Sequence, residues 1–185
     1  TIFALIKLLV LRDSTVDGQT KLGLFHNWCI KSGQENLYKE NFSLEDIIET
    51  LPCYTTTGVS ESRALLQIKT KDHGLLKARF QQALEKEWKE KKQALKEKYG
   101  IYSYVAICNN GTKETTDISD FSISGRGGLK ILFTDENKKN VAYIWMRGSG
   151  TEPVFRILCD VKGNKPQTEA ELLEWETSML KSVDL

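Results

Sequence analysis

Apolar side chains recur every three or four residues over two long stretches of the chain. The first stretch covers residues 75–99 and the second covers residues 167–182. Spacing of this kind gathers the apolar side chains on one face of an α-helix. The sequence therefore predicts two amphipathic helices, with these apolar residues facing a core: Leu76, Phe80, Leu84, Trp88, Leu95 and Tyr99 in the first, and Leu172, Leu173, Trp175, Met179 and Leu180 in the second.

Between these helices the pattern changes to short runs rich in β-branched and aromatic residues, which are typical of strands. A weaker strand is predicted at 63–69, and polar turns are predicted at 109–114 and 135–140. The main strand candidates are 102–108, 129–134, 141–146 and 154–161. The predicted fold class is α+β, an antiparallel β-sheet packed against helices and preceded by a short helical segment.

The amino-terminal run 1–11 is apolar on nearly every side, which predicts a helix that is buried all round. It is too short to span a bilayer and lacks the basic leader and cleavage site of a signal peptide, so no membrane association is expected. The chain starts with Thr1 and enters this apolar run directly. We therefore expect it to be a piece of a longer protein.

A second amino-terminal helix is predicted from Ser43, which two acidic residues follow in the first turn. Pro52 would end this helix. The stretch that comes next has the composition of a linker or of the entry to a strand. We place the domain boundary there, which gives a helical segment 1–54 and a main domain 55–185.

Composition restricts the class of partner. The chain of 185 residues has 26 basic and 25 acidic side chains, a formal net charge of +1 that gives no electrostatic footprint for nucleic acid. Aromatic residues on the predicted strands leave a nucleic-acid-binding sheet as a weaker alternative. The four cysteines form no CxxC pair, which favours a reducing cytoplasm. The chain has only two histidines, His26 and His73, and a zinc site is not expected.

The densest candidate chemistry lies in the stretch 147–156, RGSGTEPVFR, between two predicted strands. Arg147 and Arg156 carry planar guanidinium groups that fit phosphate oxygens in a bidentate manner. Ser149 and Thr151 add hydroxyl donors between them. These residue types together favour a site for an oxyanion.

The glycines of this stretch have a separate role. Gly148 and Gly150 permit positive φ angles, with which successive backbone N–H groups converge on an anion. The alternative is an ordinary polar hairpin turn, but the density of donors argues against it. The stretch also differs from the nucleotide-binding loop, because it has no lysine and a strand follows it. A second glycine-rich stretch, 123–130, has Arg126 at its centre, and a second anion contact there is left open.

The pattern R-x-S-G-T-E-P-x-x-R resembles the phosphate-binding loop of the α-D-phosphohexomutases, the family of phosphoglucomutases and phosphomannomutases. The resemblance implies that Arg147, Ser149, Gly150 and Thr151 contact the phosphate of the sugar substrate. Gly148 occupies a variable position of that pattern, and Arg156 matches its trailing arginine. We therefore list the expected phosphate-binding residues as Arg147, Gly148, Ser149, Gly150, Thr151 and Arg156.

The resemblance covers the carboxyl-terminal domain of such an enzyme, and Leu51, Pro52 and Tyr54 fit the end of the preceding, third domain. It implies an isomerase in which an enzyme phosphoserine exchanges phosphoryl groups with glucose or mannose phosphate, assisted by a magnesium ion. The serine setting T-A-S-H-N-P, the metal cluster D-G-D-x-D-R and the sugar loop G-E-x-S are absent from this sequence. We therefore expect no catalytic or metal-binding residue in this chain and no activity without the amino-terminal domains. The alternative is a stand-alone, non-catalytic module that binds a phosphorylated ligand or a protein.

Overall fold

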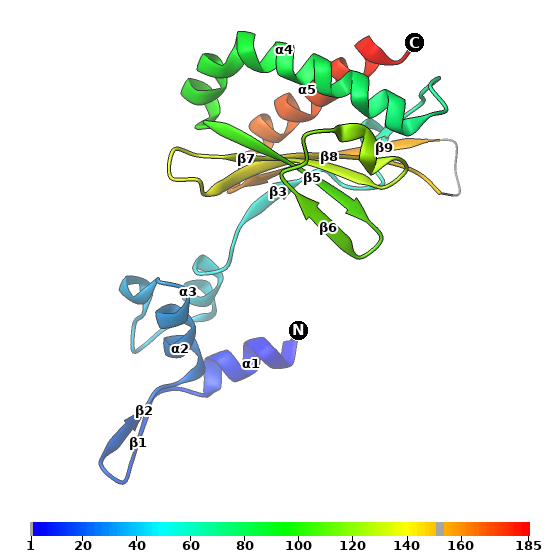
Figure 1. Ribbon diagram of the computed structural model, residues 1–185. Coiled ribbons are helices and arrows are strands. Elements are labelled where there is room, and N and C mark those ends of the chain that lie inside the picture. The colour runs from blue at the N-terminus through cyan, green and yellow to red at the C-terminus, as the bar shows by residue number, and fades with distance from the viewer. Residues whose placement is uncertain (1, 151–153) are drawn as a thin grey trace. The chain divides into compact units, whose positions relative to one another are not determined.

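The computed structural model describes residues 2–150 and 154–185 of the chain. The chain folds into two compact units, Thr1–Pro52 and Cys53–Leu185 (Figure 1). The sequence placed its boundary after Tyr54, which belongs to a strand of the second unit.

The amino-terminal unit is a small helical body with one hairpin. Its core consists of Phe25, Cys29, Phe42 and Ile47, all of them buried. Among the described residues, no helix of the chain combines the length and the apolar character needed to cross a membrane. The elements of the unit are α1 (Ile2–Val10), β1 (Ser14–Val16), β2 (Gln19–Lys21), α2 (Leu24–Lys31), η1 (Glu35–Leu37) and α3 (Leu44–Glu49).

Helix α3 begins as the sequence predicts. The Ser43 hydroxyl accepts hydrogen bonds from the backbone N–H groups of Glu45 and Asp46, and the Asp46 carboxylate accepts one from the N–H of Ser43 at 2.7 Å. This reciprocal capping box satisfies N–H groups that have no partner inside the helix. The helix ends earlier than predicted, with Thr50 as its C-cap.

Helix α1 corrects the prediction of burial on every side. The helix forms, but none of its described residues is buried, and Ile2 and Phe3 are 72% and 81% exposed. Only one side, with Leu5, Leu8 and Leu9, packs against the small core of this unit. That core is too small to cover a helix on all its faces.

The main unit is a seven-stranded antiparallel sheet of order β3-β9-β8-β7-β5-β6, with β4 also paired to β9. Helices α4 (His73–Tyr99) and α5 (Pro166–Val183) cover one face of this sheet (Figure 1). The predicted α+β class is confirmed. The strands are β3 (Tyr54–Thr56), β4 (Leu65–Leu66), β5 (Ser103–Asn110), β6 (Lys113–Thr116), β7 (Gly128–Thr134), β8 (Asn140–Gly148) and β9 (Phe155–Lys162).

Three short segments differ from the sequence prediction. The predicted turn 109–114 contains the end of β5 and the start of β6, and every residue of β6 is exposed, so no apolar alternation marked it. In the predicted strand 63–69, the first two residues belong to the 3-10 helix η2 (Ser62–Ala64) and only the next two are paired as a strand. β3 lies in the predicted linker and pairs with β9 at the edge of the sheet.

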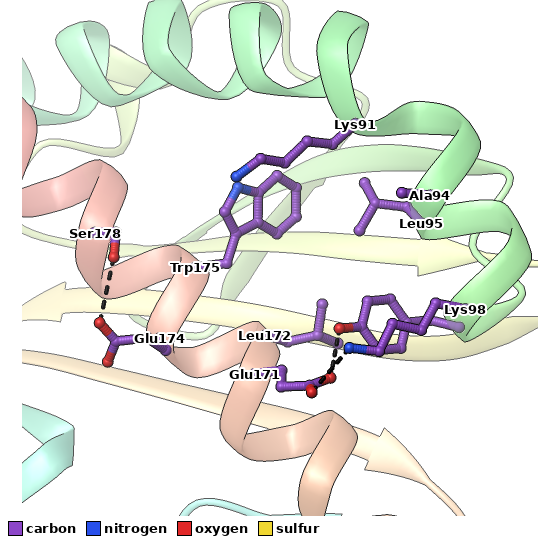
Figure 2. A pocket seen from close by; sticks show the side chains of 10 residues that line it. Lys91, Ala94, Leu95, Lys98, Glu171, Leu172, Glu174, Trp175 and Ser178 are labelled. Carbon is purple, nitrogen blue, oxygen red and sulfur yellow. Dashed lines mark hydrogen bonds and ion pairs between the residues drawn. The ribbon is translucent and has the colours of Figure 1, made fainter.

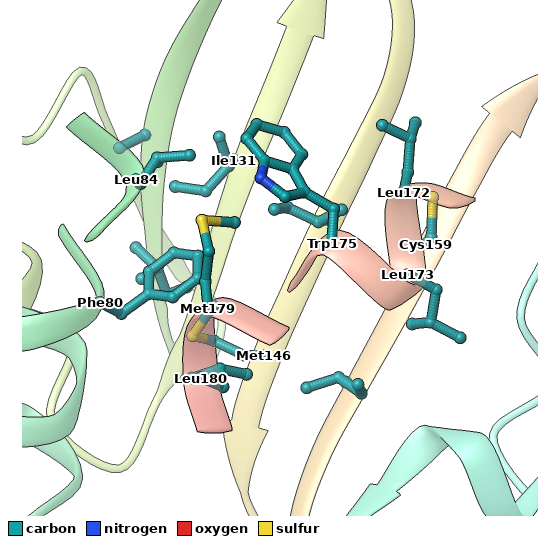
Figure 3. Packing of buried hydrophobic residues seen from close by; sticks show 14 of the residues in the cluster. Phe80, Leu84, Ile131, Met146, Cys159, Leu172, Leu173, Trp175, Met179 and Leu180 are labelled. Atoms are coloured by element: carbon teal, nitrogen blue, oxygen red, sulfur yellow. The ribbon is translucent and has the colours of Figure 1, made fainter. Parts of the chain in front are cut away.

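The core lies between the two helices and the covered face of the sheet (Figure 3). Phe80 and Leu84 of α4, together with Leu172 and Met179 of α5, pack onto buried strand residues such as Ile131. Side chains alternate between the two faces of a strand. The side chains between these core positions on β8 and β9 therefore lie on the face that carries no helix.

Helix α4 is defined at both ends by local chemistry. The Asp72 carboxylate accepts a hydrogen bond from the N–H of Leu75 at 3.1 Å and caps the first turn. Gly100 ends the helix in the left-handed conformation, with φ of 68°, which glycine adopts without strain. The first residue of α4, His73, is thereby fixed above the sheet.

Candidate functional site

The stretch 147–156 joins the end of β8 to the start of β9. The backbone N–H of Ser149 donates to the carbonyl of Val154 at 2.9 Å, which continues the hairpin beyond its last strand pair. Five of the six predicted phosphate contacts lie in the described part of the chain. Thr151 lies outside the described residues, and nothing is derived from it.

The two arginines of this stretch are direct cross-strand neighbours. Arg147 on β8 is paired in register with Arg156 on β9. Their chain neighbours Met146 and Phe155 are buried under the helices, so both guanidinium groups lie on the face without helices. Two guanidinium groups on neighbouring strands of one face can bind the same oxyanion.

Both arginines remain accessible to a ligand to some degree. Arg147 is exposed and Arg156 is half-buried. Nη1 of Arg156 donates to the carbonyl oxygen of Val59 at 3.1 Å, which orients this side chain along the strand edge. A guanidinium group has five N–H donors, so Arg156 can contact more than one acceptor at a time.

Gly148 is required for a steric reason that the sequence does not reveal. A Cβ atom at this position would lie 2.1 Å from Nδ1 and from Cε1 of His73. The imidazole also packs edge-on against Phe155, with ring centroids 5.4 Å apart. Neither Gly148 nor Gly150 has a positive φ, so the left-handed backbone that glycine permits is not used at either position.

His73 was not a predicted site residue, yet its ring forms the base of this loop. Burial lowers the pKa of His73, and the charges of Lys77 and Arg126 lower it further, whereas Asp72 acts in the opposite direction. The imidazole is therefore neutral at pH 7. Its Nδ1 is shielded from solvent and has no hydrogen-bond partner among the described residues.

Lys77 lies one helical turn beyond His73 and is completely buried. Its Nζ donates to the carbonyl oxygens of Gly125, at 2.9 Å, and of Gly127, at 2.6 Å. Burial lowers the pKa of Lys77 to about 8; Cys108 opposes this shift and the charge of Arg147 adds to it. The sequence signal for this residue is its place between His73 and Phe80, on the apolar face of α4.

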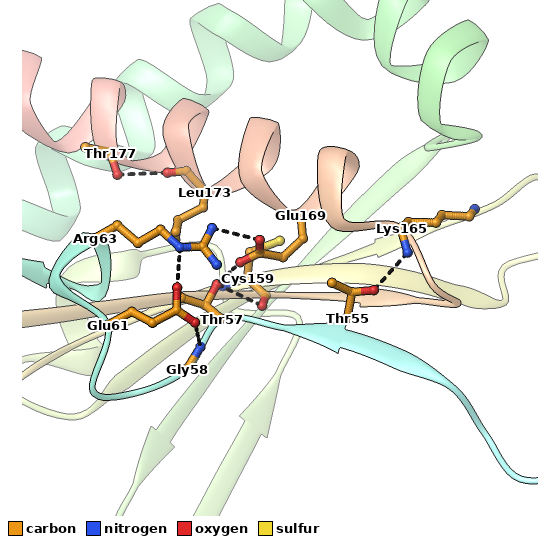
Figure 4. A network of polar contacts seen from close by, with 10 residues as sticks. All are labelled: Thr55, Thr57, Gly58, Glu61, Arg63, Cys159, Lys165, Glu169, Leu173 and Thr177. Atoms are coloured by element: carbon orange, nitrogen blue, oxygen red, sulfur yellow. Dashed lines mark hydrogen bonds and ion pairs between the residues drawn. The ribbon is translucent and has the colours of Figure 1, made fainter.

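Two other groups of polar residues do not form a second site. In the first, Nη1 of Arg63 pairs with the buried carboxylate of Glu169 at 2.8 Å, and Nε of Arg63 pairs with Glu61 at 2.5 Å (Figure 4). The Thr57 hydroxyl also donates to Glu169. These groups satisfy one another and join the segment before β4 to α5.

The second group lines a hollow of about 440 Å³ between α4 and α5 (Figure 2). The Glu171 carboxylate accepts hydrogen bonds there from Nζ of Lys98, at 2.9 Å, and from the Tyr99 hydroxyl, at 2.5 Å. The hollow lies at the carboxyl end of α4, whereas His73 lies at its amino end. Lys98 pairs with Glu171, Lys91 pairs with Glu87, and the Glu174 carboxylate accepts a hydrogen bond from Ser178, so we assign the hollow no chemistry.

The described residues contain no group of three His, Cys, Asp or Glu side chains placed to hold a metal ion. The magnesium ion that the resemblance implies therefore has no ligand set among them, and we assign no residue of this chain to it. Comparisons of the chain with protein-family models, with curated proteins and with solved structures find no match. Support for a function therefore comes from the loop and its surroundings alone.

Proposed function

We propose that this chain is the carboxyl-terminal, phosphate-binding portion of an α-D-phosphohexomutase, a phosphoglucomutase or phosphomannomutase of the cytoplasm. Its ligand is the phosphate group of glucose or mannose phosphate. The observation that carries the proposal is the pairing of Arg147 with Arg156 across β8 and β9, on a hairpin with the sequence RGSGTEPVFR. Two guanidinium groups side by side on this face fit an oxyanion such as phosphate or carboxylate, and the resemblance of the loop favours phosphate.

The chemistry of the loop fits a positioning role. Its described polar side chains are those of arginine and serine, which bind phosphate oxygens without acting as acid or base at pH 7. In the proposed enzyme, a phosphoserine elsewhere in the protein exchanges phosphoryl groups with one end of the sugar while this loop holds the phosphate at the other end. Each hydrogen bond to a charged group contributes roughly 1.5 to 3 kcal/mol, so a few suffice to orient the substrate.

Arg147→Lys tests the loop directly. We expect the affinity for inorganic phosphate to fall about tenfold, because a point charge cannot reproduce a bidentate fork. Amide chemical shifts of Gly148, Ser149 and Gly150, followed during a phosphate titration of the 185-residue chain, measure it. Lys139→Arg is the control, because Lys139 lies in the turn before β8, at the opposite end of that strand. Equal affinity of wild type and Arg147→Lys contradicts the assignment of Arg147.

The alternative is a stand-alone module that binds a phosphorylated ligand without catalysis. It is favoured by the absence of the serine, metal and sugar motifs from this sequence. The reading frame upstream of Thr1 discriminates the two, because a mutase must encode those motifs there. We also expect the 185-residue chain alone to be inactive, and interconversion of glucose 1-phosphate and glucose 6-phosphate by it would contradict the proposal.

A further inference from the structure

A second glycine-rich loop lies beside the proposed phosphate loop. Strand β7 begins at Gly128 and β8 ends at Gly148, and the two strands pair with Leu129 opposite Met146. One step further along this antiparallel register, Gly128 comes level with Arg147. The residues that precede Gly128 therefore run next to the residues that follow Arg147, at the same end of the sheet.

The loop 125–127 is held rigidly by the buried lysine. Nζ of Lys77 donates to the carbonyls on both sides of Arg126, those of Gly125 and Gly127. A side chain at position 127 is excluded, because its Cβ would lie 2.1 Å from Oδ1 of Asn110. Arg126 is thus the one residue of this loop with a long side chain, and it is exposed.

Positive charge gathers where the two loops meet. The charges of Arg126 and Lys77 lower the pKa of His73, whose ring lies against Gly148. The charge of Arg147 lowers the pKa of Lys77. The Asp72 carboxylate raises the pKa of His73, and it also accepts the hydrogen bond that caps α4.

We propose that Arg126 is a further phosphate-binding residue, a third guanidinium group that closes the site from the β7 side. Lys77 is the positioning residue that holds it there. The inference rests on the proposed function and adds that the site prefers the dianionic form of the phosphate group, because three guanidinium groups favour a dianion over a monoanion of the same shape.

The test compares Arg126→Gln with Lys139→Gln in the 185-residue chain. Both variants remove one positive charge, but Lys139 lies at the other end of β8. At pH 7.5 we expect Arg126→Gln to lower the affinity for inorganic phosphate about tenfold, the value of one charge-assisted hydrogen bond. Lys139→Gln should change it less than twofold. Because Arg126 is exposed, circular dichroism should show both variants folded.

Dimethyl phosphate, a monoanion of similar geometry, is the second probe. We expect Arg126→Gln to weaken its binding less than that of inorganic phosphate. If Arg126→Gln and Lys139→Gln bind phosphate equally while Arg147→Gln binds more weakly, the role of Arg126 is overturned and the proposed function stands. Equal losses for both probes overturn the selectivity for a dianion. Absence of phosphate binding by the wild-type chain overturns both proposals.

Discussion

The two helices that cover the sheet each bury an ionisable side chain, and the two side chains are treated differently. Lys77 on α4 donates to two carbonyls and supports the loop beside the proposed phosphate site. Glu176 on α5 is fully buried, and neither carboxylate oxygen has a hydrogen-bond partner among the described residues. Burial raises the pKa of Glu176 well above 4.5, so the group is driven towards its neutral form. A buried ionisable group thus stabilises the fold only where it forms hydrogen bonds.

Replacing Lys77 should give the largest effect. Lys77→Met keeps most of the side-chain volume but removes the donor to the carbonyls of Gly125 and Gly127. We expect the free energy of unfolding to fall by about 3 kcal/mol, measured by urea denaturation. Lys89→Met, at an exposed position of the same helix, is the control and should change it by less than about 0.5 kcal/mol. Equal stability of the two variants would show that Lys77 supports nothing.

Glu169 on α5 provides the paired counterpart of Glu176. Glu169→Met removes the partner of Arg63 and of the Thr57 hydroxyl. Since Arg63 is partly exposed and retains Glu61, we expect a loss of about 2 kcal/mol in the free energy of unfolding, measured in the same urea titrations. An increase in stability would contradict the structural role of this network.

The same exchange at Glu176 should have the opposite sign. Glu176→Met removes a buried carboxyl group that has no partner among the described residues, so we expect a gain of about 1 to 2 kcal/mol at pH 7. Urea denaturation of the Glu176→Met and Glu169→Met variants side by side gives the comparison within one helix. Destabilisation at position 176 would mean that its carboxyl group has a favourable contact.

The pH dependence of stability sharpens the same contrast. A carboxyl group whose pKa is raised on folding stabilises the protein fully below its unfolded pKa, near 4.5 for Glu176, and this contribution is lost as pH rises towards the folded pKa. The stability difference between wild type and Glu176→Gln should therefore change by up to about 1.4 kcal/mol per pH unit above 4.5. Parallel pH profiles would contradict a raised pKa at Glu176.

The sequence predicts the long elements well because their periodicity is strong. Helix α4 begins two residues before the predicted start and ends at Tyr99, as predicted. The strand β6 escaped prediction because all four of its residues are exposed, and β3 because it is a short edge strand within a turn-rich stretch. Short exposed strands depend on pairing partners that no local pattern specifies.

The candidate site likewise has residues that the sequence predicts and residues that it does not. The stretch 147–156 is visible in the sequence because its donors are consecutive. The pairing of Arg147 with Arg156 follows from the register of the hairpin. The contacts of Lys77 and His73 have no local signal beyond the place of Lys77 on the apolar face of α4, because Lys77 meets carbonyls 48 and 50 residues away and His73 meets a glycine on another strand. Contacts of this range arise only when the helix is folded onto the sheet.

The central claim is that loop 147–156 binds the phosphate of a hexose phosphate. A crystal structure of the 185-residue chain with glucose 6-phosphate tests it most directly. We expect the phosphate oxygens to lie within hydrogen-bond distance, about 3 Å, of Arg147 and of the Ser149 hydroxyl, on the side of the sheet that carries Arg156. A phosphate group bound in the hollow between α4 and α5, beside Lys91 and Lys98, with none at this loop, would contradict the account.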